Sequence, residues 1–445
     1  MLIYGVILVS FLALQLAILL RRHERAGRFQ LNAGLVLVTS FFAYTVALPF
    51  SRVVLGTESS GGDVERDYMI NSLLAALGIT IGLFMCPSPK PAEDTKEFWR
   101  VQGLLSRSQI GRGLMVLTVT LTLGATFFYI LSQVGYSLYR LAGAYGAGEN
   151  SGDNATLIDT LLVPFAIAAV LHYLYAARTG AVKGAGVTLI KMMCFALFAM
   201  FFAQGHRNLM LYLGLSALAL RLYRRPVRLG IFAILMIVSV MGLYAIGIVR
   251  NWGWTQIDEV AIAESAFDPL HGELGTPFSV FDKLQEGRGD DSLLMGRTYT
   301  LDSVVNLVPQ QLWRDRPPSP AVQFSRNYFG TDDLPSGLGY SPVIEALINF
   351  SIYGIVVVFA ITTVLFIRLD QWLRRQSRIG VLISCLLLPT IVNWNRIDFA
   401  ASSKMFLIYA AFIWGLDKLF YAPYEVTATA RPTTALPLRY AERGR

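Results

Sequence analysis

Long uncharged stretches of apolar residues constrain this chain more than any other feature of its sequence. Runs of about twenty such residues recur along its whole length, and about twenty apolar residues in a helix suffice to cross the hydrocarbon core of a bilayer. Hydrophobic residues make up 54% of the 445 residues, and charged residues make up 15%. The sequence therefore predicts an all-α polytopic membrane protein.

The apolar runs predict about eleven transmembrane helices. The first run is followed at once by Arg21, Arg22 and Arg25, whereas a secretory signal peptide carries its charge before the apolar core. We therefore expect a retained helix with its N-terminus outside and, after eleven crossings, a cytoplasmic C-terminus. The predicted spans are 1–20, 31–54, 68–86, 113–133, 157–176, 187–203, 208–223, 229–249, 341–367, 379–394 and 405–420.

These spans divide the chain into four parts. Residues 1–249 hold helices 1 to 8, 250–340 form a large outer loop, 341–420 hold helices 9 to 11, and 421–445 form a cytoplasmic tail. Within the loop, 257–267 and 299–307 show helical apolar spacing, and the Gly-rich stretch 286–291 predicts a turn. The loop is therefore expected to fold as short helices that cap an outward-facing cavity.

The distribution of positive charge follows membrane topology. The formal net charge is +8, but the lysines and arginines concentrate in short loops between the apolar runs, which indicates cytoplasmic turns rather than nucleic-acid binding. The three cysteines, Cys86, Cys194 and Cys385, lie in or at the ends of apolar runs, so they predict neither a disulfide framework nor a metal cluster.

Several arginines break this topological rule, because they fall on the predicted outer side. Spans 208–220 and 379–394 are short, so Arg207 and Arg396 at their outer ends should lie below the lipid headgroups. An arginine there costs roughly 2.5 to 3.5 kcal/mol unless it faces a wet cavity or an anion. The planar guanidinium group of arginine can donate two parallel hydrogen bonds to a phosphate. The outer arginines are Arg207, Arg250, Arg297, Arg314, Arg316, Arg326 and Arg396.

Two interpretations of these arginines stay open. They could bind an anionic substrate, or they could reach lipid phosphates and pair with the acidic residues of the loop, such as Asp332 and Asp333. The functional interpretation is favoured for Arg207 and Arg396, because each lies at the mouth of a short span.

Four short motifs resemble the O-antigen polymerase (Wzy) and oligosaccharide repeat-unit polymerase families. The turn at Arg207 is similar to a Gly-x-Arg turn between two middle helices of those proteins, and the spacing of Arg326 and Gly337 resembles their Arg-x10-Gly pattern. Ile397 departs from the family, which often has glycine there. The motifs are 204–208 (QGHRN), 308–317 (VPQQLWRDRP), 337–350 (GLGYSPVIEALINF) with Gly354, and 395–399 (NRIDF).

The resemblance implies a GT-C-like member of the O-antigen polymerase and ligase superfamily in the bacterial inner membrane. Such an enzyme would transfer a glycan from undecaprenyl diphosphate to the end of another lipid-linked repeat unit at the periplasmic face. Arginines would stabilise the diphosphate without a metal. The sequence shows no zinc-binding spacing or Gly-rich nucleotide loop, so no cofactor is expected. A chain-length regulator is a further candidate partner beside the lipid-linked oligosaccharide and the bilayer.

The acceptor hydroxyl needs a base, for which the chain offers four candidates: Glu345, His206, His271 and Asp398. Glu345 begins the ninth span, where it could act as the base or pair with Arg207 or Arg396. His206 adjoins Arg207 and could act as acid, base or diphosphate donor. Asp398 could simply pair with Arg396, and His271 is expected at the loop surface.

Aromatic residues on the outer side allow a role in sugar binding. Trp313 could cover a sugar face or pack within the loop, and Tyr340 lies in the motif that precedes the ninth span. Trp394 and the other outer tryptophans are expected in the aromatic belt of the membrane interface.

Three functions therefore remain: a repeat-unit polymerase, an O-antigen ligase, and a flippase for lipid-linked glycans. Ligases typically carry a histidine where this chain has 341–345, which disfavours the ligase. A flippase should have charges distributed through several helices and internal repeats, whereas the charges here cluster at the outer ends. A structural scaffold with several spans is disfavoured, because arginines below the headgroups would cost free energy without serving a function.

Overall fold

The computed structural model describes twelve segments and five further residues of the chain. They are 2–22, 28–46, 62–86, 109–133, 153–203, 207–223, 226–228, 276–287, 293–308, 315–329, 341–374 and 377–421, with single residues and a pair at 136, 230–231, 234 and 313. The fold is helical, and within the described residues the one sheet is a pair of three-residue antiparallel strands, β1 (Arg28–Gln30) and β2 (Pro226–Arg228).

The predicted apolar runs form helices. Five helices are long and apolar enough to cross a membrane, and they include α4 (Gly62–Met85), α6 (Gln109–Gln133), α8 (Asp153–Arg178), α17 (Pro342–Leu373) and α19 (Phe399–Phe420). Shorter apolar helices are α1 (Leu2–Arg22), α2 (Ala33–Phe41) continued by a π-helical turn (Phe42–Val46), α9 (Ala185–Ala203), the series α10 (Arg207–Met210), η2 (Leu211–Leu215) and α11 (Ser216–Leu222), and α18 (Arg378–Trp394). The run 229–249 lies almost wholly outside the described residues.

The predicted all-α membrane architecture is thus confirmed, whereas the count of eleven spans stays a prediction. Several boundaries were wrong: the third helix begins at 62 rather than at 68, the ninth ends at 373 rather than at 367, and the last helix begins at Phe399 rather than at 405. The side chain of Asp398 accepts a hydrogen bond from the N–H of Ala401 at 2.6 Å and so caps the helix at that point. Such a cap satisfies one of the free backbone donors of the first turn.

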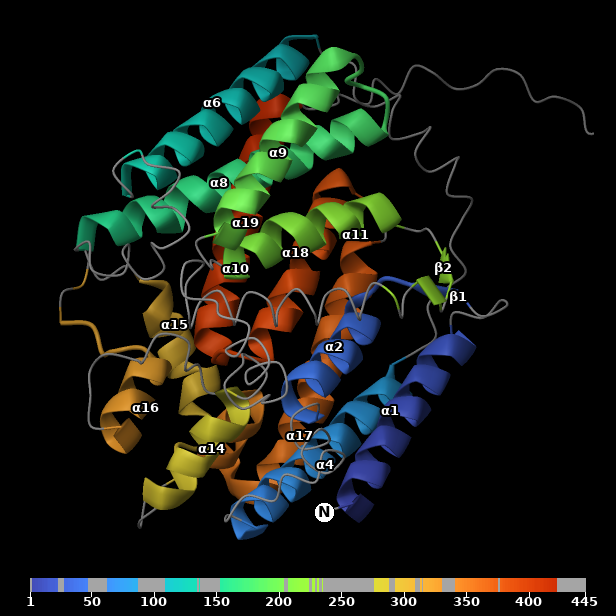
Figure 1. Cartoon of the computed structure of the whole chain (residues 1–445), viewed down its shortest axis with the longest axis vertical. Helices are drawn as coiled ribbons and strands as arrows, with labels where there is room; N and C mark the ends of the chain where they lie inside the picture. The colour runs from blue at the N-terminus through green and yellow to red at the C-terminus, as the bar shows by residue number, and fades with distance from the viewer. Residues whose placement is uncertain are drawn as a thin grey trace, which may run out of the picture.

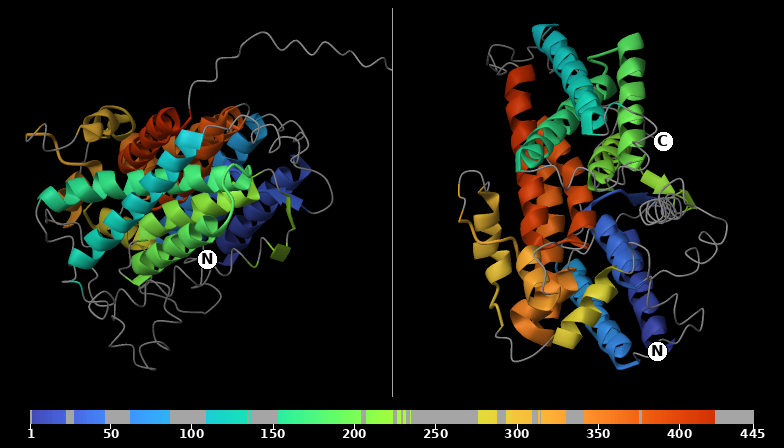
Figure 2. Two further views of the ribbon diagram at one scale, coloured as in Figure 1. Left: turned by 90° about the horizontal axis from the view of Figure 1, so that it is seen from above. Right: turned by 60° about the vertical axis from the view of Figure 1, so that its left-hand side comes forward.

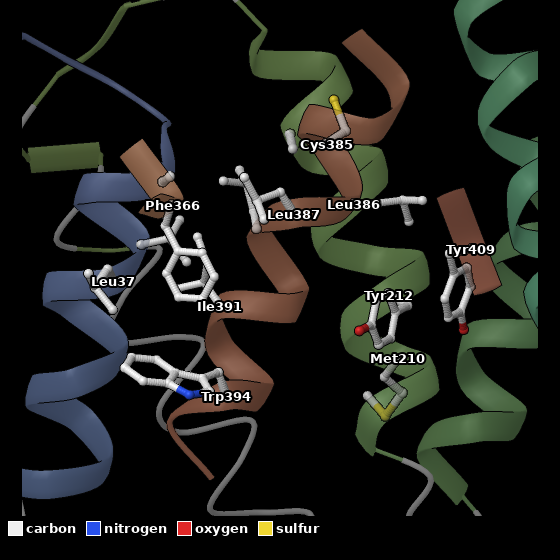
Figure 3. Packing of buried hydrophobic residues seen from close by; sticks show 14 of the residues in the cluster. Leu37, Met210, Tyr212, Phe366, Cys385, Leu386, Leu387, Ile391, Trp394 and Tyr409 are labelled. Atoms are coloured by element: carbon white, nitrogen blue, oxygen red, sulfur yellow. The ribbon is translucent and has the colours of Figure 1, made fainter. Parts of the chain in front are cut away.

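Helix α18 is the centre of the bundle. Nearly every side chain from Gly380 to Trp394 is buried, as expected of a helix that is apolar on all sides. It packs against α2, α11, α17 and α19. Figure 3 shows its side chains directed to both sides, Leu387 and Ile391 toward Leu37 of α2 and Leu386 toward Tyr409 of α19.

Trp394 corrects one prediction. It is 1% exposed and lies against Phe359 and Phe366 of α17, with ring centroids 5.3 and 5.5 Å away. The expected place in the interfacial aromatic belt is therefore wrong, because the C-terminal turn of α18 is covered by other helices.

Helices α4 and α17 pack closely against each other. Gly78 and Gly82 lie one turn apart and leave room for the α17 backbone, since a Cβ at Gly78 would come within 2.5 Å of the Val356 carbonyl oxygen. Small residues at this spacing allow helices in a membrane to approach closely. The pair forms the middle of the lower half of the molecule in Figure 1, with α1 on one side.

The described part of the long loop contains four short helices: α14 (Thr276–Gly287), η4 (Arg297–Tyr299), α15 (Leu301–Leu307) and α16 (Pro320–Phe329). The predicted helix at 299–307 is confirmed by η4 and α15, whereas 257–267 lies outside the described residues. Figures 1 and 2 show α15 and α16 on one side of α17 and α1 on the other. Contacts join α15 to α19, η4 to α17, and α14 to both α4 and α16.

Candidate functional site

A buried polar cluster lies where the loop meets the beginnings of α17 and α19. We define it by five residues: Thr298, Asp302, Glu345, Asn349 and Asp398. Each is at most 5% exposed. They come from η4, α15, α17 and the residue before α19, so three segments far apart in the sequence contribute to it.

Glu345 is the centre of this cluster. Its side chain is 0% exposed, and its Oε2 atom accepts a hydrogen bond from the backbone N–H of Phe399 at 2.9 Å. Its Oε1 atom has no hydrogen-bond partner within the described part of the chain. The Phe399 N–H therefore holds the carboxylate through Oε2 and the Thr298 hydroxyl lies close beside the carboxylate, while Oε1 itself forms no hydrogen bond among the described residues.

A break interrupts α17 shortly after Glu345. Ser351 has φ of 61° and ψ of −169°, a conformation that interrupts the helix and frees carbonyl groups of the preceding turn. The N–H groups of Leu294 and Met295 donate to the carbonyls of Ile348 and Asn349 at 3.2 and 3.0 Å. The loop thus satisfies the backbone groups that the break exposes.

Asn349 joins the loop to the same turn of α17. Its side-chain nitrogen donates to the Thr298 hydroxyl at 2.8 Å and to the Glu345 carbonyl at 2.7 Å. The ring of Tyr299 packs between Phe350 and Phe399, with ring centroids 6.2 and 5.5 Å away. These contacts hold η4 against α17 and α19.

The carboxyl groups of Asp302, Glu345 and Asp398 lie close enough together to repel one another when charged. Burial raises the pKa of Asp398 to about 6, an effect opposed by the N–H groups at the start of α19. Burial also raises the pKa of Tyr299 well above its usual value, so its phenol stays protonated. Its hydroxyl has no partner among the described residues, which leaves a potential donor beside the carboxyl groups.

Arg396 lies in the turn between α18 and α19, two residues before Asp398. It is 7% exposed, and its Nη1 atom donates to the side-chain oxygen of Asn208 in α10 at 2.8 Å. The guanidinium is therefore buried within the bundle and does not point into lipid. This contact places Asn208, the last residue of the 204–208 motif, beside the 395–399 motif.

Two of the three ion pairs considered for this region do not form. Glu345 binds the Phe399 amide rather than Arg396, and Asp398 caps α19 rather than pairing with Arg396. Both results follow from geometry, because the N-terminus of α19 presents its free N–H groups to these two carboxylates. The possible pairing of Glu345 with Arg207 remains open, because the structure does not describe the Arg207 side chain.

Arg316 lies next to the loop helix α15. Its Nη1 atom donates to the carbonyls of Val308 and Asn306 at 2.8 and 3.3 Å. It is close enough to Lys404, in the second turn of α19, to interact with it electrostatically. Two cations thus lie near each other at the N-terminal part of α19, and Lys404 was not among the residues that the sequence indicated.

The remaining candidates are distributed differently. Arg326 is exposed in the last turn of α16 and Trp313 is 43% exposed, so neither belongs to the buried polar cluster. Arg207 begins α10. Five candidates lie outside the described residues: His206, Arg250, His271, Arg314 and Tyr340.

The sequence did not indicate four further functional candidates: Asp302, Tyr299, Asn349 and Lys404. Lys404 could have been noticed as a charge in the first turns of an apolar helix. Asp302 could not, because its loop position gives no sign that it is buried beside two other carboxyl groups.

Comparison with protein families gives one match. Residues 323–422 match the family described as O-antigen polysaccharide polymerase Wzy. The matched segment contains α17, α18 and α19, and with them Glu345, Arg396, Asp398 and Lys404. Neither a curated protein nor a solved structure matches the chain. The resemblance to the Wzy family that the sequence motifs indicated is therefore confirmed over this segment.

Proposed function

On the premise that residues 323–422 carry the O-antigen polysaccharide polymerase (Wzy) domain, we propose that the protein polymerises lipid-linked glycan repeat units. The substrate is an undecaprenyl-diphosphate-linked oligosaccharide, and the product is an O-antigen, capsule or exopolysaccharide chain. The observation that carries the proposal is the buried Glu345 carboxylate with one unpartnered oxygen, in the matched segment and beside the turn that holds Arg396.

Glu345 is proposed as the general base. A base must be fixed in position and must present a free oxygen within hydrogen-bond reach of the proton that it removes. The Phe399 N–H fixes Oε2, and Asn349 fixes the backbone of the same turn, which leaves Oε1 to receive the proton of the acceptor hydroxyl. His206 is the alternative base, or a donor to the diphosphate.

The diphosphate is proposed to bind basic side chains and not a metal ion. Arginine pairs with phosphate through two parallel charge-assisted hydrogen bonds. Fixed cations in a site with little water stabilise the charge of a leaving group strongly. Arg396 is held by Asn208, and Arg316 lies beside Lys404, so two basic groups of this kind flank α19. The further binding residues proposed are Arg207, Arg250, Arg314, Arg326, Trp313 and Tyr340.

In the proposed step, the hydroxyl oxygen of the acceptor glycan attacks the anomeric carbon of the donor glycan. The bond from that carbon to the diphosphate oxygen breaks, and undecaprenyl diphosphate leaves with the electron pair. The hydroxyl proton moves to Oε1 of Glu345. The reaction passes through an oxocarbenium-like state, and the diphosphate is already an activated leaving group.

We place the reaction at the periplasmic face of the inner membrane, with the N-terminus periplasmic and the C-terminus cytoplasmic. The positive charge of the short loops supports this orientation. The loop 250–340 then lies over the outer ends of the helices and excludes water, which would otherwise compete with the acceptor. A chain-length regulator is a candidate protein partner.

Glycan profiles from a strain that lacks this protein test the proposal. Polymerase activity predicts that the strain accumulates single repeat units, and that the wild-type gene restores long chains. Arg207→Ala and Arg396→Ala should not restore them although both variants insert normally. Long chains that accumulate unattached in the deletion strain would indicate a ligase instead. Long chains made by either arginine variant would contradict the roles assigned to these residues.

A further inference from the structure

Helix α15 buries its polar side chains and exposes its apolar ones. Its buried residues are polar, Asp302 and Asn306, whereas its exposed residues are apolar. The exposed fractions of Leu301 and Val304 are 58% and 65%, and Leu307 on the same face is 39% exposed. A helix at the surface of a water-soluble domain shows the opposite arrangement, because apolar side chains are then turned toward the core.

The neighbouring loop helices show the ordinary arrangement. In α14, Phe281 and Leu284 are buried. In α16, Phe324 is buried, whereas Arg326 and Asn327 are exposed. Among the described helices of the loop, the inversion is therefore confined to α15.

Charge around α15 is low. Residues 293–308 contain two charged side chains, Arg297 and Asp302, and these pair with each other, with Nε and Oδ1 3.1 Å apart. The segment that leads into α15 also exposes apolar groups, Leu293 and Met295. A neutral, apolar outer surface is costly in water and favourable in hydrocarbon.

The apolar face of α15 lies next to the exposed apolar surface of two candidate spans. The helix packs against α19, and η4 packs against α17. Both of these helices are candidate membrane spans. Most of their exposed side chains are apolar and large, among them Tyr353, Val357, Ile361 and Leu365 of α17 and Leu407 and Trp414 of α19. Figure 1 shows α15 beside the lower part of α19.

We propose that α15 is embedded in the bilayer, with Leu301, Val304 and Leu307 among the lipid acyl chains and Asp302 turned toward the buried polar cluster. Amphipathic helices at a membrane surface bury their apolar face in this way. The helix then forms the wall that separates the carboxyl groups of Asp302, Glu345 and Asp398 from lipid. The inference is independent of the polymerase proposal, because it rests on the burial pattern alone.

Fluorescence quenching in nanodiscs tests this inference. Val304→Cys carries an environment-sensitive fluorophore in the full-length protein, in which Cys86, Cys194 and Cys385 are replaced by alanine. Asn327→Cys, exposed on α16, serves as the matched control within the same loop. Lipids with a nitroxide on the acyl chain report contact with hydrocarbon, and iodide reports contact with water. Leu307→Cys provides a second position on the same face, should the first variant fail to fold.

We expect the labels on α15 and α16 to respond to the two quenchers in opposite ways. Nitroxide lipids should quench the label at 304 or 307 strongly and iodide should quench it weakly, whereas the label at 327 should behave in the opposite way. Quenching by iodide at 304 and 307 would overturn the inference, because the face would then be in water. Protection from both quenchers would also overturn it, because a protein surface, a second copy of the chain included, would then cover α15.

Discussion

The Nη1 atom of Arg396 donates a hydrogen bond to the side-chain oxygen of Asn208 at 2.8 Å, although the two residues are 188 positions apart. The contact joins the beginning of α10 to the turn between α18 and α19, and it orients a guanidinium that is buried within the bundle.

We expect Asn208→Ala to lower the rate of chain extension less than Arg396→Ala does, because the charge remains while its orientation is lost. In the double variant, the asparagine substitution should add little. Residues in direct contact show coupling energies of about 0.5 to 3 kcal/mol in a double-mutant cycle. Transfer rates of the purified proteins with lipid-linked repeat units measure this coupling. Strictly additive effects would mean that Asn208 does not orient Arg396.

Glu345→Gln should reduce chain extension by about 10²- to 10⁴-fold, the usual contribution of a general base. The folded state should persist, because the glutamine oxygen can still accept the hydrogen bond from the Phe399 N–H. Transfer assays and thermal unfolding of the same preparation measure both effects.

Asp370→Asn is the matched control for this substitution. Asp370 is a second buried carboxylate of α17, and it accepts hydrogen bonds from Arg374, Ser384 and the N–H of Ala33. Removing one partner of a buried ion pair costs about 3 to 5 kcal/mol, so this variant should lose stability. If Glu345→Gln lost as much stability as Asp370→Asn, its effect on activity would not indicate catalysis.

Gly78→Ala and Gly82→Ala should each destabilise the protein by about 1 to 3 kcal/mol, as overpacking does. The added methyl group would meet α17 within 2.5 Å at Gly78 and 2.6 Å at Gly82. Gly124 of α6 is the control, because nothing lies within 4 Å of a Cβ built there. Gly124→Ala should leave the melting temperature unchanged or raise it, since alanine favours a helix more than glycine does. Equal melting temperatures for all three variants would contradict the close α4–α17 contact.

Asp398→Asn should change how stability depends on pH. The pKa of the Asp398 carboxyl is raised to about 6 by burial, so between about pH 4 and pH 6 the folded state binds more protons than the unfolded state. The wild type therefore loses stability as pH rises through this window. Asparagine also caps helices well, so the variant keeps the cap without this loss.

The stability of Asp398→Asn relative to the wild type should consequently rise from pH 4 to pH 6 and stay constant above it. Each pKa unit corresponds to about 1.36 kcal/mol, which gives a change on the order of 2 to 3 kcal/mol. Chemical unfolding of both proteins across this pH range measures the difference. Parallel curves would show that Asp398 does not titrate on folding.

The sequence by itself determined the helices of this protein. In hydrocarbon every backbone group must be paired within its own segment, so an apolar run such as 109–133 or 378–394 has one available conformation, and its length and composition are sufficient to predict it. The late turn around Arg396 was also predictable, because a charge at the end of a short apolar run can be read directly from the order of residues.

Only the tertiary structure decided which side chains meet. The break of α17 at Ser351 lies inside an unbroken apolar run, and it exists because the N–H groups of Leu294 and Met295 replace the helical partners. The inverted burial of α15 and the contact of Glu345 with Phe399 depend in the same way on segments remote in the chain. Backbone pairing in a helix is local, whereas the partner of a buried side chain is fixed by how distant helices pack. Residue order alone does not encode that geometry in any short pattern.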